Sequence, residues 1–423
     1  MTNIKFSDLG LAEPVLRALA ARNHVTPTPI QAQAIPGLMD CRDMLGIAQT
    51  GTGKTAAFAL PVLHRFRDPR PKKNIRRPRA LVLAPTRELA IQIGEEFGAY
   101  SAHMKLRHTV IFGGVNEKRQ ISALKRGLDL VIATPGRLLD LFARDFVDLS
   151  GIEYFVLDEA DRMLDMGFVR DVRKIVAALP DERQSLLFSA TMPKEIARLS
   201  TEILHDPLRI EIAPQATPVE LIEQSVRHVA AGGGKTEALR NIFSDPGLER
   251  VIVFTRTKHR ANRVAEQLER MGVSAAAIHG NKSQAARQKA LNRFREGKCR
   301  VMVATDIAAR GIDIDGVTHV VNYELPNEPE SYVHRIGRTA RAGASGVAIA
   351  FCDPSERKYL RDIERLLKKS LRVVGDGPEG EETAPPQRRG HGHQGHGQRP
   401  ANSNGKPRRR RGKPRRRNRQ KAA

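Results

Sequence analysis

Residues 46–55 read GIAQTGTGKT, and this stretch decides how the rest of the chain is interpreted. It is a form of the pattern Gly-x4-Gly-Lys-Thr, in which Ala48 takes the first position. Glycines let backbone N–H groups approach phosphate oxygens, and the N-terminus of a following helix adds a favourable dipole. We therefore interpret the stretch as a nucleoside triphosphate site, in which Lys54 reaches the β- and γ-phosphates and the Thr55 hydroxyl binds Mg²⁺.

The segments on either side predict a strand before this loop and a helix after it, because DMLGIA precedes it and AAFALPVL follows. Farther along, short apolar runs alternate with amphipathic stretches of helical length. Such alternation predicts a parallel sheet covered on both faces, and the fold class is therefore α/β. The runs lie at residues 80–84, 109–112, 128–133, 154–158 and 185–189.

A Pro-punctuated connector at residues 207–222 separates this half from a second set of apolar runs. The second half repeats the architecture of the first, but its GGGK segment at 232–235 lacks the full spacing and is interpreted as a turn. One nucleotide site is therefore expected to serve two domains. The second set of runs lies at residues 225–230, 250–255, 275–279, 300–305, 318–323 and 346–352.

Charge and composition set the last part of the chain apart. The 423 residues carry a net charge of +24, and residues 385–423 hold 11 Arg and 3 Lys with no acidic residue. The excess charge predicts a polyanionic partner. Segments rich in Gly, Pro, Gln and Arg bury too little apolar area to fold, so the tail is predicted to be disordered. The predicted divisions are 1–208, a linker at 209–222, 223–373 and a tail at 374–423.

The sequence predicts neither a leader nor a membrane segment. Its first residues have no apolar core, and no run of about 18 apolar residues occurs. Cys41, Cys299 and Cys352 are widely spaced, which indicates neither disulfides nor a zinc site. We expect a cytoplasmic protein.

Two acidic residues follow the apolar run YFVL. Asp158 is placed to hold Mg²⁺, directly or through water, and Glu159 to orient and deprotonate the attacking water. The alternative is an acidic helix start, where carboxylates are favourable. The preceding phosphate loop favours the first interpretation.

Residues 158–161 spell DEAD, and the chain resembles the DEAD-box RNA helicases. A dozen ordered matches between residues 6 and 341 carry this resemblance, which implies two tandem RecA-like domains. The connector and the tail are most similar to the bacterial RhlE-type branch. Besides the phosphate loop and DEAD, the matches include PTPIQ (27–31), PTREL (85–89), TPGR (134–137), SAT (189–191), VFTRTK (253–258), HGNKSQAAR (279–287), ATDIAARGID (304–313) and HRIGRTAR (334–341).

The resemblance implies that ATP is the nucleotide. The Gln31 amide can pair with N6 and N7 of adenine, although a glutamine that caps a turn after Pro29 is the alternative. His24 stands where the family has Tyr or Phe to stack on adenine, and Asp313 is expected to contact the ribose. The full expected set is Phe6, His24, Gln31, Gln49, Thr50, Gly51, Thr52, Gly53, Lys54, Thr55 and Asp313.

Two arginines are expected to complete the ATP site from the second domain. Arg338 and Arg341 lie three residues apart, so a helix would place both on one face toward the γ-phosphate. A solvated basic face is the alternative. Ala340 replaces the family's common glycine, and a helical conformation is predicted to tolerate it.

The resemblance also supplies the RNA contacts and the residues that couple them to ATP. The side chains suit a phosphodiester backbone, and the aromatic content of 4% with no Trp predicts largely sequence-independent binding. For each of them alone, a surface position or a helix cap is the alternative. The RNA contacts are Arg87, Gly114, Thr134, Arg137, Gln284, Arg287 and Thr305, and the coupling residues are Asp161, Ser189, Thr191 and His334.

These observations predict an ATP-dependent RNA helicase that uses ATP and Mg²⁺ and binds single strands and short duplexes of RNA. The core is expected to be monomeric and to have no membrane partner. Ribosomal precursors or RNA-decay proteins are candidate partners. Two alternatives are a non-catalytic RNA chaperone that acts through the basic tail, and a phosphate-loop kinase of a small metabolite.

Overall fold

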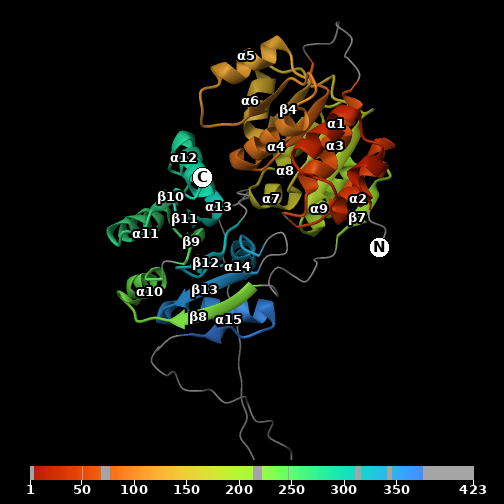
Figure 1. Ribbon diagram of the computed structural model, residues 1–423. Coiled ribbons are helices and arrows are strands. Elements are labelled where there is room, and N and C mark those ends of the chain that lie inside the picture. The colour runs from red at the N-terminus through yellow and green to blue at the C-terminus, as the bar shows by residue number, and fades with distance from the viewer. Residues whose placement is uncertain are drawn as a thin grey trace, which may run out of the picture. The chain divides into compact units, whose positions relative to one another are not determined.

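The computed structural model describes residues 4–49, 51–67, 77–212, 222–245, 247–309, 316–340 and 345–374. These residues form two parallel seven-stranded sheets flanked by helices, which confirms the predicted α/β class with two RecA-like domains (Figure 1). The predicted tail, apart from its first residue Val374, lies outside the described residues. No helix in the described part of the chain is long and apolar enough to cross a membrane.

The first sheet has the strand order β3-β4-β2-β5-β6-β1-β7, and all its strands are parallel. Five of its strands are buried along their whole length, which is why four of them are continuously apolar. The carboxyl ends of parallel strands meet at one edge of the sheet, so the loops that follow β1, β2, β5 and β6 are neighbours there. The bounds are β1 Met44–Ile47, β2 Ala80–Leu83, β3 His108–Ile111, β4 Leu130–Ala133, β5 Tyr154–Leu157, β6 Gln184–Ser189 and β7 Leu208–Glu211.

Helices cover both faces of this sheet and create two apolar cores. On one face lie α1 (Glu13–Ala21), α2 (Pro29–Met39), α3 (Lys54–Arg65) and α4 (Arg87–Tyr100). On the other lie α5 (Lys118–Arg126), α6 (Pro135–Ala143), α7 (Ala160–Asp165), α8 (Val169–Val176) and α9 (Lys194–Ile203). A short 3₁₀ helix, η1 (Phe6–Leu9), precedes them.

The edge strand β7 falls in the segment that we expected to be connector. It pairs with β1 in parallel register from Met44 opposite Leu208 to Ile47 opposite Glu211. Its sequence LRIE alternates apolar and polar residues, and only Ile210 is buried. An edge strand with one buried position carries too weak an apolar signal to be recognised from the sequence.

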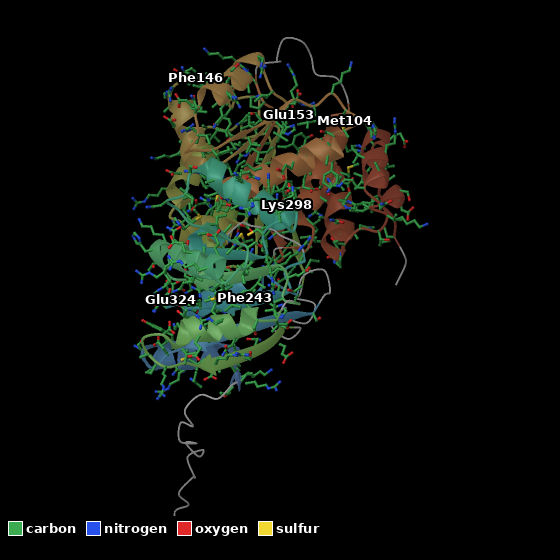
Figure 2. All side chains as sticks on the ribbon, turned by 60° about the vertical axis from the view of Figure 1, so that its left-hand side comes forward. Met104, Phe146, Glu153, Phe243, Lys298 and Glu324 are labelled. Carbon is green, nitrogen blue, oxygen red and sulfur yellow. The ribbon has the colours of Figure 1, made fainter. Side chains whose placement is uncertain are left out.

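The second sheet has the order β10-β11-β9-β12-β13-β8-β14, which matches the first sheet strand for strand. Figure 2 shows Phe146 and Glu153 on the first domain and Phe243 and Glu324 on the second. The strands are β8 Ile222–His228, β9 Val251–Thr255, β10 Ala275–Ile278, β11 Val301–Thr305, β12 His319–Asn322, β13 Gly346–Cys352 and β14 Arg372–Val373. Its helices are α10 Gly234–Phe243, α11 Lys258–Arg270, α12 Gln284–Arg295, α13 Asp306–Ala309, α14 Pro329–Ile336 and α15 Arg357–Leu367, with a 3₁₀ turn η3 at Pro354–Glu356.

The matching order makes β8 and α10 the counterparts of β1 and α3. Three residues separate the end of β8 from the GGGK segment, whose Gly234 and Lys235 begin α10. Our interpretation of this segment as a turn was therefore wrong for its second half. The strand before it corresponds to the apolar run that we predicted at 225–230, although β8 begins and ends a few residues earlier and mixes polar residues with its apolar ones.

Candidate nucleotide and RNA sites

The phosphate loop joins β1 to α3 at the carboxyl edge of the first sheet. Gly51 and Gly53 have φ angles of 87° and 92°, which lie in the left-handed region that favours glycine. Lys54 is the first residue of α3, and its Nζ donates a 2.8 Å hydrogen bond to the Ala48 carbonyl across the loop. The Thr52 hydroxyl donates to the Gln49 carbonyl at 2.8 Å. The loop thus positions a buried lysine at a helix start, where backbone N–H groups favour an anion.

Gln31, on α2, stabilises this loop through hydrogen bonds. Its Oε1 accepts from the Thr28 backbone N–H at 2.8 Å, and its Nε2 donates to the Gly53 carbonyl at 3.0 Å. A Cβ at Gly53 would lie 2.4 Å from that Nε2, so any larger residue would displace the Gln31 amide. The predicted capping role is present, and one N–H and one lone pair of the amide remain for a base.

The two aromatic positions of the N-terminal arm differ in exposure. Phe6 is buried in the apolar core on the α1 side of the sheet, and its N–H donates to the Val25 carbonyl at 3.1 Å. His24 is exposed, and its ring centroid lies 6.2 Å from that of Tyr100. Partial burial lowers the His24 pKa, with a smaller effect from Arg22, which favours the neutral ring. Phe6 therefore holds the arm in place, and His24 presents a ring to solvent.

Asp158 and Glu159 follow β5, and both are buried. Burial raises the pKa of Asp158 to about 6, against the lowering effect of the Lys54 ammonium. Burial also raises the Glu159 pKa, but the Arg162 guanidinium and Lys54 together hold it below its ordinary value. Glu159 has a φ of 52°, a conformation that is uncommon for a side chain of this type. A proton is thus favoured on Asp158 before Glu159.

The donor set suits Mg²⁺. Asp158 is a carboxylate that burial pushes toward its protonated form, so a cation beside it would restore the charged form. The Thr55 hydroxyl, one residue after Lys54, would offer a second hard oxygen, which is the kind of ligand that Mg²⁺ prefers. No cluster of three His, Cys, Asp or Glu that could hold a metal occurs among the described residues.

Asp161 connects α7 to the end of β6. Its Oδ2 accepts from the Thr191 N–H and hydroxyl, both at 2.9 Å, and from the Ala190 N–H at 3.2 Å. The Ser189 hydroxyl donates to the Thr191 carbonyl at 2.7 Å and accepts from the Asp161 N–H at 3.2 Å. Three of the predicted coupling residues therefore form one hydrogen-bonded unit, and none of these bonds goes to Asp158.

Two of the expected RNA contacts of the first domain meet directly. A Cβ at Gly114 would lie 2.3 Å from the Arg87 guanidinium, so the missing side chain lets that group lie against the backbone. Thr134 is the N-cap of α6, and Arg137 lies on its first turn. The Arg137 Nη1 is buried and has no hydrogen-bond partner within the described residues. Such a group suits an incoming phosphate oxygen.

The expected RNA contacts of the second domain lie on two elements. Gln284 and Arg287 occupy the first turn of α12, which Ser283 caps by accepting from the Ala286 N–H at 3.3 Å. Thr305 ends β11, directly before α13. Both α12 and the end of β11 therefore offer donors at helix starts.

Arg338 does not lie in a helix, contrary to our expectation. Helix α14 carries His334 but ends at Ile336, and Ala340 has a φ of 54°. The prediction that Ala340 is helical was wrong, because Gly337 ends the helix and the chain then turns through the left-handed region. Arg338 lies in this turn, with its Nε 3.2 Å from the His334 carbonyl. Thr50, Asp313 and Arg341 lie outside the described residues.

The sequence interpretation missed Arg162. Its guanidinium pairs with the Glu159 carboxylate, and both side chains are largely buried. The spacing of three residues at a helix start was the available signal. It was overlooked because an arginine at the start of a helix is more often solvated.

A parallel sheet with a phosphate loop after one strand and an acidic pair after another defines a nucleoside triphosphatase core of the RecA-like class. Residues 28–199 match the DEAD/DEAH box helicase family, and residues 234–343 match the helicase conserved C-terminal domain. The chain belongs to the DEAD/DEAH box helicase family.

Similar proteins cover most of this chain. The ATP-dependent RNA helicase CshA of Listeria monocytogenes is 45% identical over 370 residues, which are 88% of this chain and 70% of that protein. DeaD of Klebsiella pneumoniae is 46% identical over 87% of this chain, but the chain spans only 57% of its length. The structure of S. cerevisiae Dbp5 bound to RNA and ADP BeF3 is 33% identical, with a TM-score of 0.77 over 87% of this chain and 95% of that one.

Proposed function

We propose that this protein is an RNA helicase that hydrolyses ATP when RNA is bound and thereby separates short duplexes or remodels RNA-protein complexes. The observation that carries this proposal is the buried Lys54 beside Asp158 and Glu159 at one edge of the first sheet. This arrangement combines an anion site with a carboxylate of low pKa. The similarity to a helicase bound to RNA and a nucleotide analogue supports it.

In the proposed reaction, Glu159 orients the attacking water and accepts its proton on the carboxylate. Arg162 favours the ionised form that can accept it. Lys54 stabilises the charge that develops on the phosphates, and Arg338 and Arg341 add to it from the second domain. Thr55 and Asp158 would hold Mg²⁺, which supplies charge neutralisation at the phosphates. Hydrolysis then depends on the two domains coming together.

The finer assignments belong to the same proposal. Gln31, His24 and Asp313 bind the nucleoside, and the seven RNA contacts named above bind the RNA backbone. The divisions 1–208, 223–373 and 374–423 are kept as domains and tail. Membership in the RhlE-type branch rests on the connector and the tail. A cytoplasmic, monomeric enzyme that acts on ribosomal precursors or with RNA-decay proteins remains our expectation.

The variant Glu159→Gln tests the catalytic role. It keeps the shape of the side chain but cannot accept the proton, so turnover should fall by at least about a hundredfold. Binding of ATP and single-stranded RNA should remain, as measured by equilibrium titration. Glu153→Gln, an exposed partner of Arg79 in the same domain, is the matched control and should retain activity. Normal turnover in Glu159→Gln would remove Glu159 from its role.

A second candidate function, a non-catalytic RNA chaperone, is favoured by the charge of the tail. Residues 385–423 carry 14 basic and no acidic residues. Their deletion should weaken RNA binding and reduce its salt dependence, while RNA-stimulated ATP hydrolysis survives. The chaperone would be the better description if two results were found together. The full chain would separate RNA strands without ATP, and the deletion variant would not separate them at all.

A further inference from the structure

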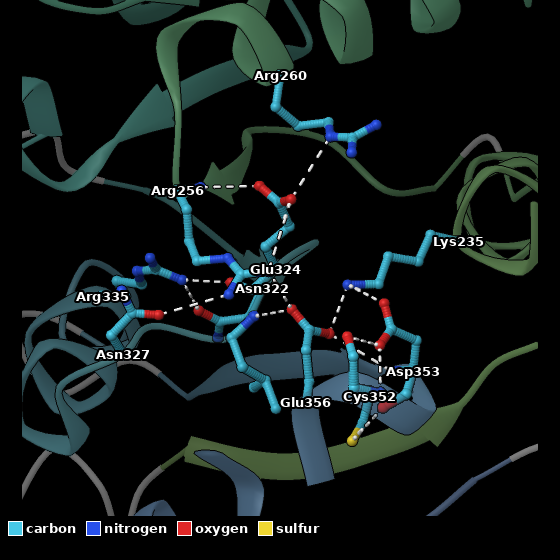
Figure 3. A network of polar contacts seen from close by, with 12 residues as sticks. Lys235, Arg256, Arg260, Asn322, Glu324, Asn327, Arg335, Cys352, Asp353 and Glu356 are labelled. Atoms are coloured by element: carbon cyan, nitrogen blue, oxygen red, sulfur yellow. Dashed lines mark hydrogen bonds and ion pairs between the residues drawn. The ribbon is translucent and has the colours of Figure 1, made fainter. Parts of the chain in front are cut away.

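Glu356 is a completely buried carboxylate outside every site described so far. It lies at the end of η3, between β13 and α15. Its Oε1 accepts from the Leu325 backbone N–H at 3.2 Å and pairs with Arg256 at 3.2 Å. Its Oε2 pairs with Lys235 and accepts from the Asp353 N–H at 3.4 Å. One side chain thus joins the segments that follow β8, β9, β12 and β13, as Figure 3 shows.

Lys235 explains why a carboxylate lies at this place. It is the counterpart of Lys54. Each lysine follows a glycine and lies at the start of a helix, α3 after β1 in the first sheet and α10 after β8 in the second, and β1 and β8 hold equivalent places in the two strand orders. In the first domain this position faces an expected phosphate. In the second, Lys235 pairs with Glu356 and with Asp353 at 3.4 Å. The protein's own carboxylates thus occupy the anion position of the second domain.

The peptide unit between Glu324 and Leu325 connects Glu356 to helix α14. Its N–H donates to Glu356, and its carbonyl accepts from the Arg335 Nη1 at 2.7 Å. Because a peptide unit is planar, a change at one of these bonds tilts the other. Arg256 adds a second connection, since its backbone N–H donates to the Glu324 carboxylate at 2.9 Å.

Arg335 fixes the position of α14. Its side chain is 1% exposed, and it donates to both carboxylate oxygens of Asp306 and to the Asn322 side chain. Arg338 follows three residues later, in the turn that ends the helix. A shift of the Arg335 guanidinium therefore moves the segment that carries Arg338.

We propose that Glu356 is a positioning residue for Arg338, acting through the peptide unit 324–325 and Arg335. This inference rests on the proposed function, in which Arg338 stabilises charge during ATP hydrolysis. A group that acts only in the transition state affects kcat rather than the binding of ATP. Loss of the Glu356 charge should therefore lower kcat and leave the KM for ATP unchanged.

The test compares Glu356→Gln with wild type in RNA-stimulated ATP hydrolysis by the full chain. We expect kcat to fall about tenfold, with KM for ATP within about twofold. Asp362→Asn, which removes an exposed surface pair with Arg365, is the control and should not change kcat. Circular dichroism at the assay temperature establishes that each variant is folded.

A double-mutant cycle separates positioning from general destabilisation. In an Arg338→Ala background, Glu356→Gln should cause no further loss of kcat, because its effect passes through Arg338. An equal loss in both backgrounds, or an unchanged kcat in the single variant, would overturn the inference. If Glu356→Gln does not fold, Glu356→Asp takes its place. The shorter side chain retains the charge but no longer reaches the Leu325 N–H, and its effect on kcat is again compared between the wild-type and Arg338→Ala backgrounds. Absence of RNA-stimulated hydrolysis in wild type would instead refute the proposed function.

Discussion

Asp43 connects three strands of the first sheet through hydrogen bonds, and its removal should destabilise that sheet selectively. Its Oδ1 accepts from the Ser185 N–H and its Oδ2 from the His205 N–H, both at 2.7 Å. The side chain is buried, with 8% of the residue exposed. Asp43→Ala would leave two backbone donors without their acceptor.

The magnitude follows from these two bonds. Hydrogen bonds to a charged group contribute about 1.5 to 3 kcal/mol each, so the free energy of unfolding of this sheet should fall by about 3 to 6 kcal/mol. That is roughly two to four orders of magnitude in the opening equilibrium. The backbone bond from the Leu208 N–H to the Asp43 carbonyl persists and limits the loss.

Hydrogen exchange measured by mass spectrometry on the full chain can resolve this effect by domain. Peptides that cover β6 should lose protection by at least a hundredfold, whereas peptides that cover β9 should not change. Asp40→Ala, an exposed position three residues earlier, is the control. A loss of less than tenfold at β6, or an equal loss in both sheets, would refute the reasoning that Asp43 holds this sheet.

Three further predictions concern the nucleotide site and the turn after α14. Since burial raises the Asp158 pKa to about 6, its charge costs stability at higher pH when no cation is present. Asp158→Asn should therefore raise the unfolding temperature in EDTA at pH 7.5, and the difference from wild type should shrink as pH falls from 6 toward 4. An unfolding temperature equal to that of wild type at pH 7.5 would show that the buried Asp158 charge does not destabilise the fold. His24→Phe should lower the KM for ATP several-fold, because a larger ring buries more area against adenine, and an unchanged KM would remove His24 from the site. Ala340→Gly relieves left-handed backbone strain of about 1 to 2 kcal/mol in the folded state. Two losses offset this gain: a buried methyl group, about 0.8 kcal/mol, and the greater backbone freedom of glycine in the unfolded chain, about 0.5 to 1 kcal/mol. Thermal unfolding should thus change little, and a large loss of stability would show that the methyl packing dominates.

The sequence was most informative where a local pattern has one physical cause. Continuous apolar runs predicted most of the central strands, since strands covered on both faces must be apolar. The glycines and Lys54 predicted the phosphate loop, because few other residues allow backbone to approach an anion.

Features that depend on tertiary contacts escaped prediction. The burial of Phe6 depends on packing against the first sheet, and the pair of Arg162 with Glu159 depends on the backbone angle at Glu159. The end of α14 before Arg338 is a second case, because the sequence HRIGRTAR contains only one glycine to indicate a helix end. The contacts of Glu356 join four segments that are far apart in the chain, so no local sequence pattern could predict these contacts.

The pairing of Lys235 with acidic neighbours also determines binding stoichiometry. The two halves of the chain share a strand order and a Gly-Lys-Thr start after equivalent strands, so a duplicated architecture could have bound two nucleotides. Because Asp353 and Glu356 already neutralise the Lys235 amino group of the second half, binding should saturate at one molecule of ATP per polypeptide.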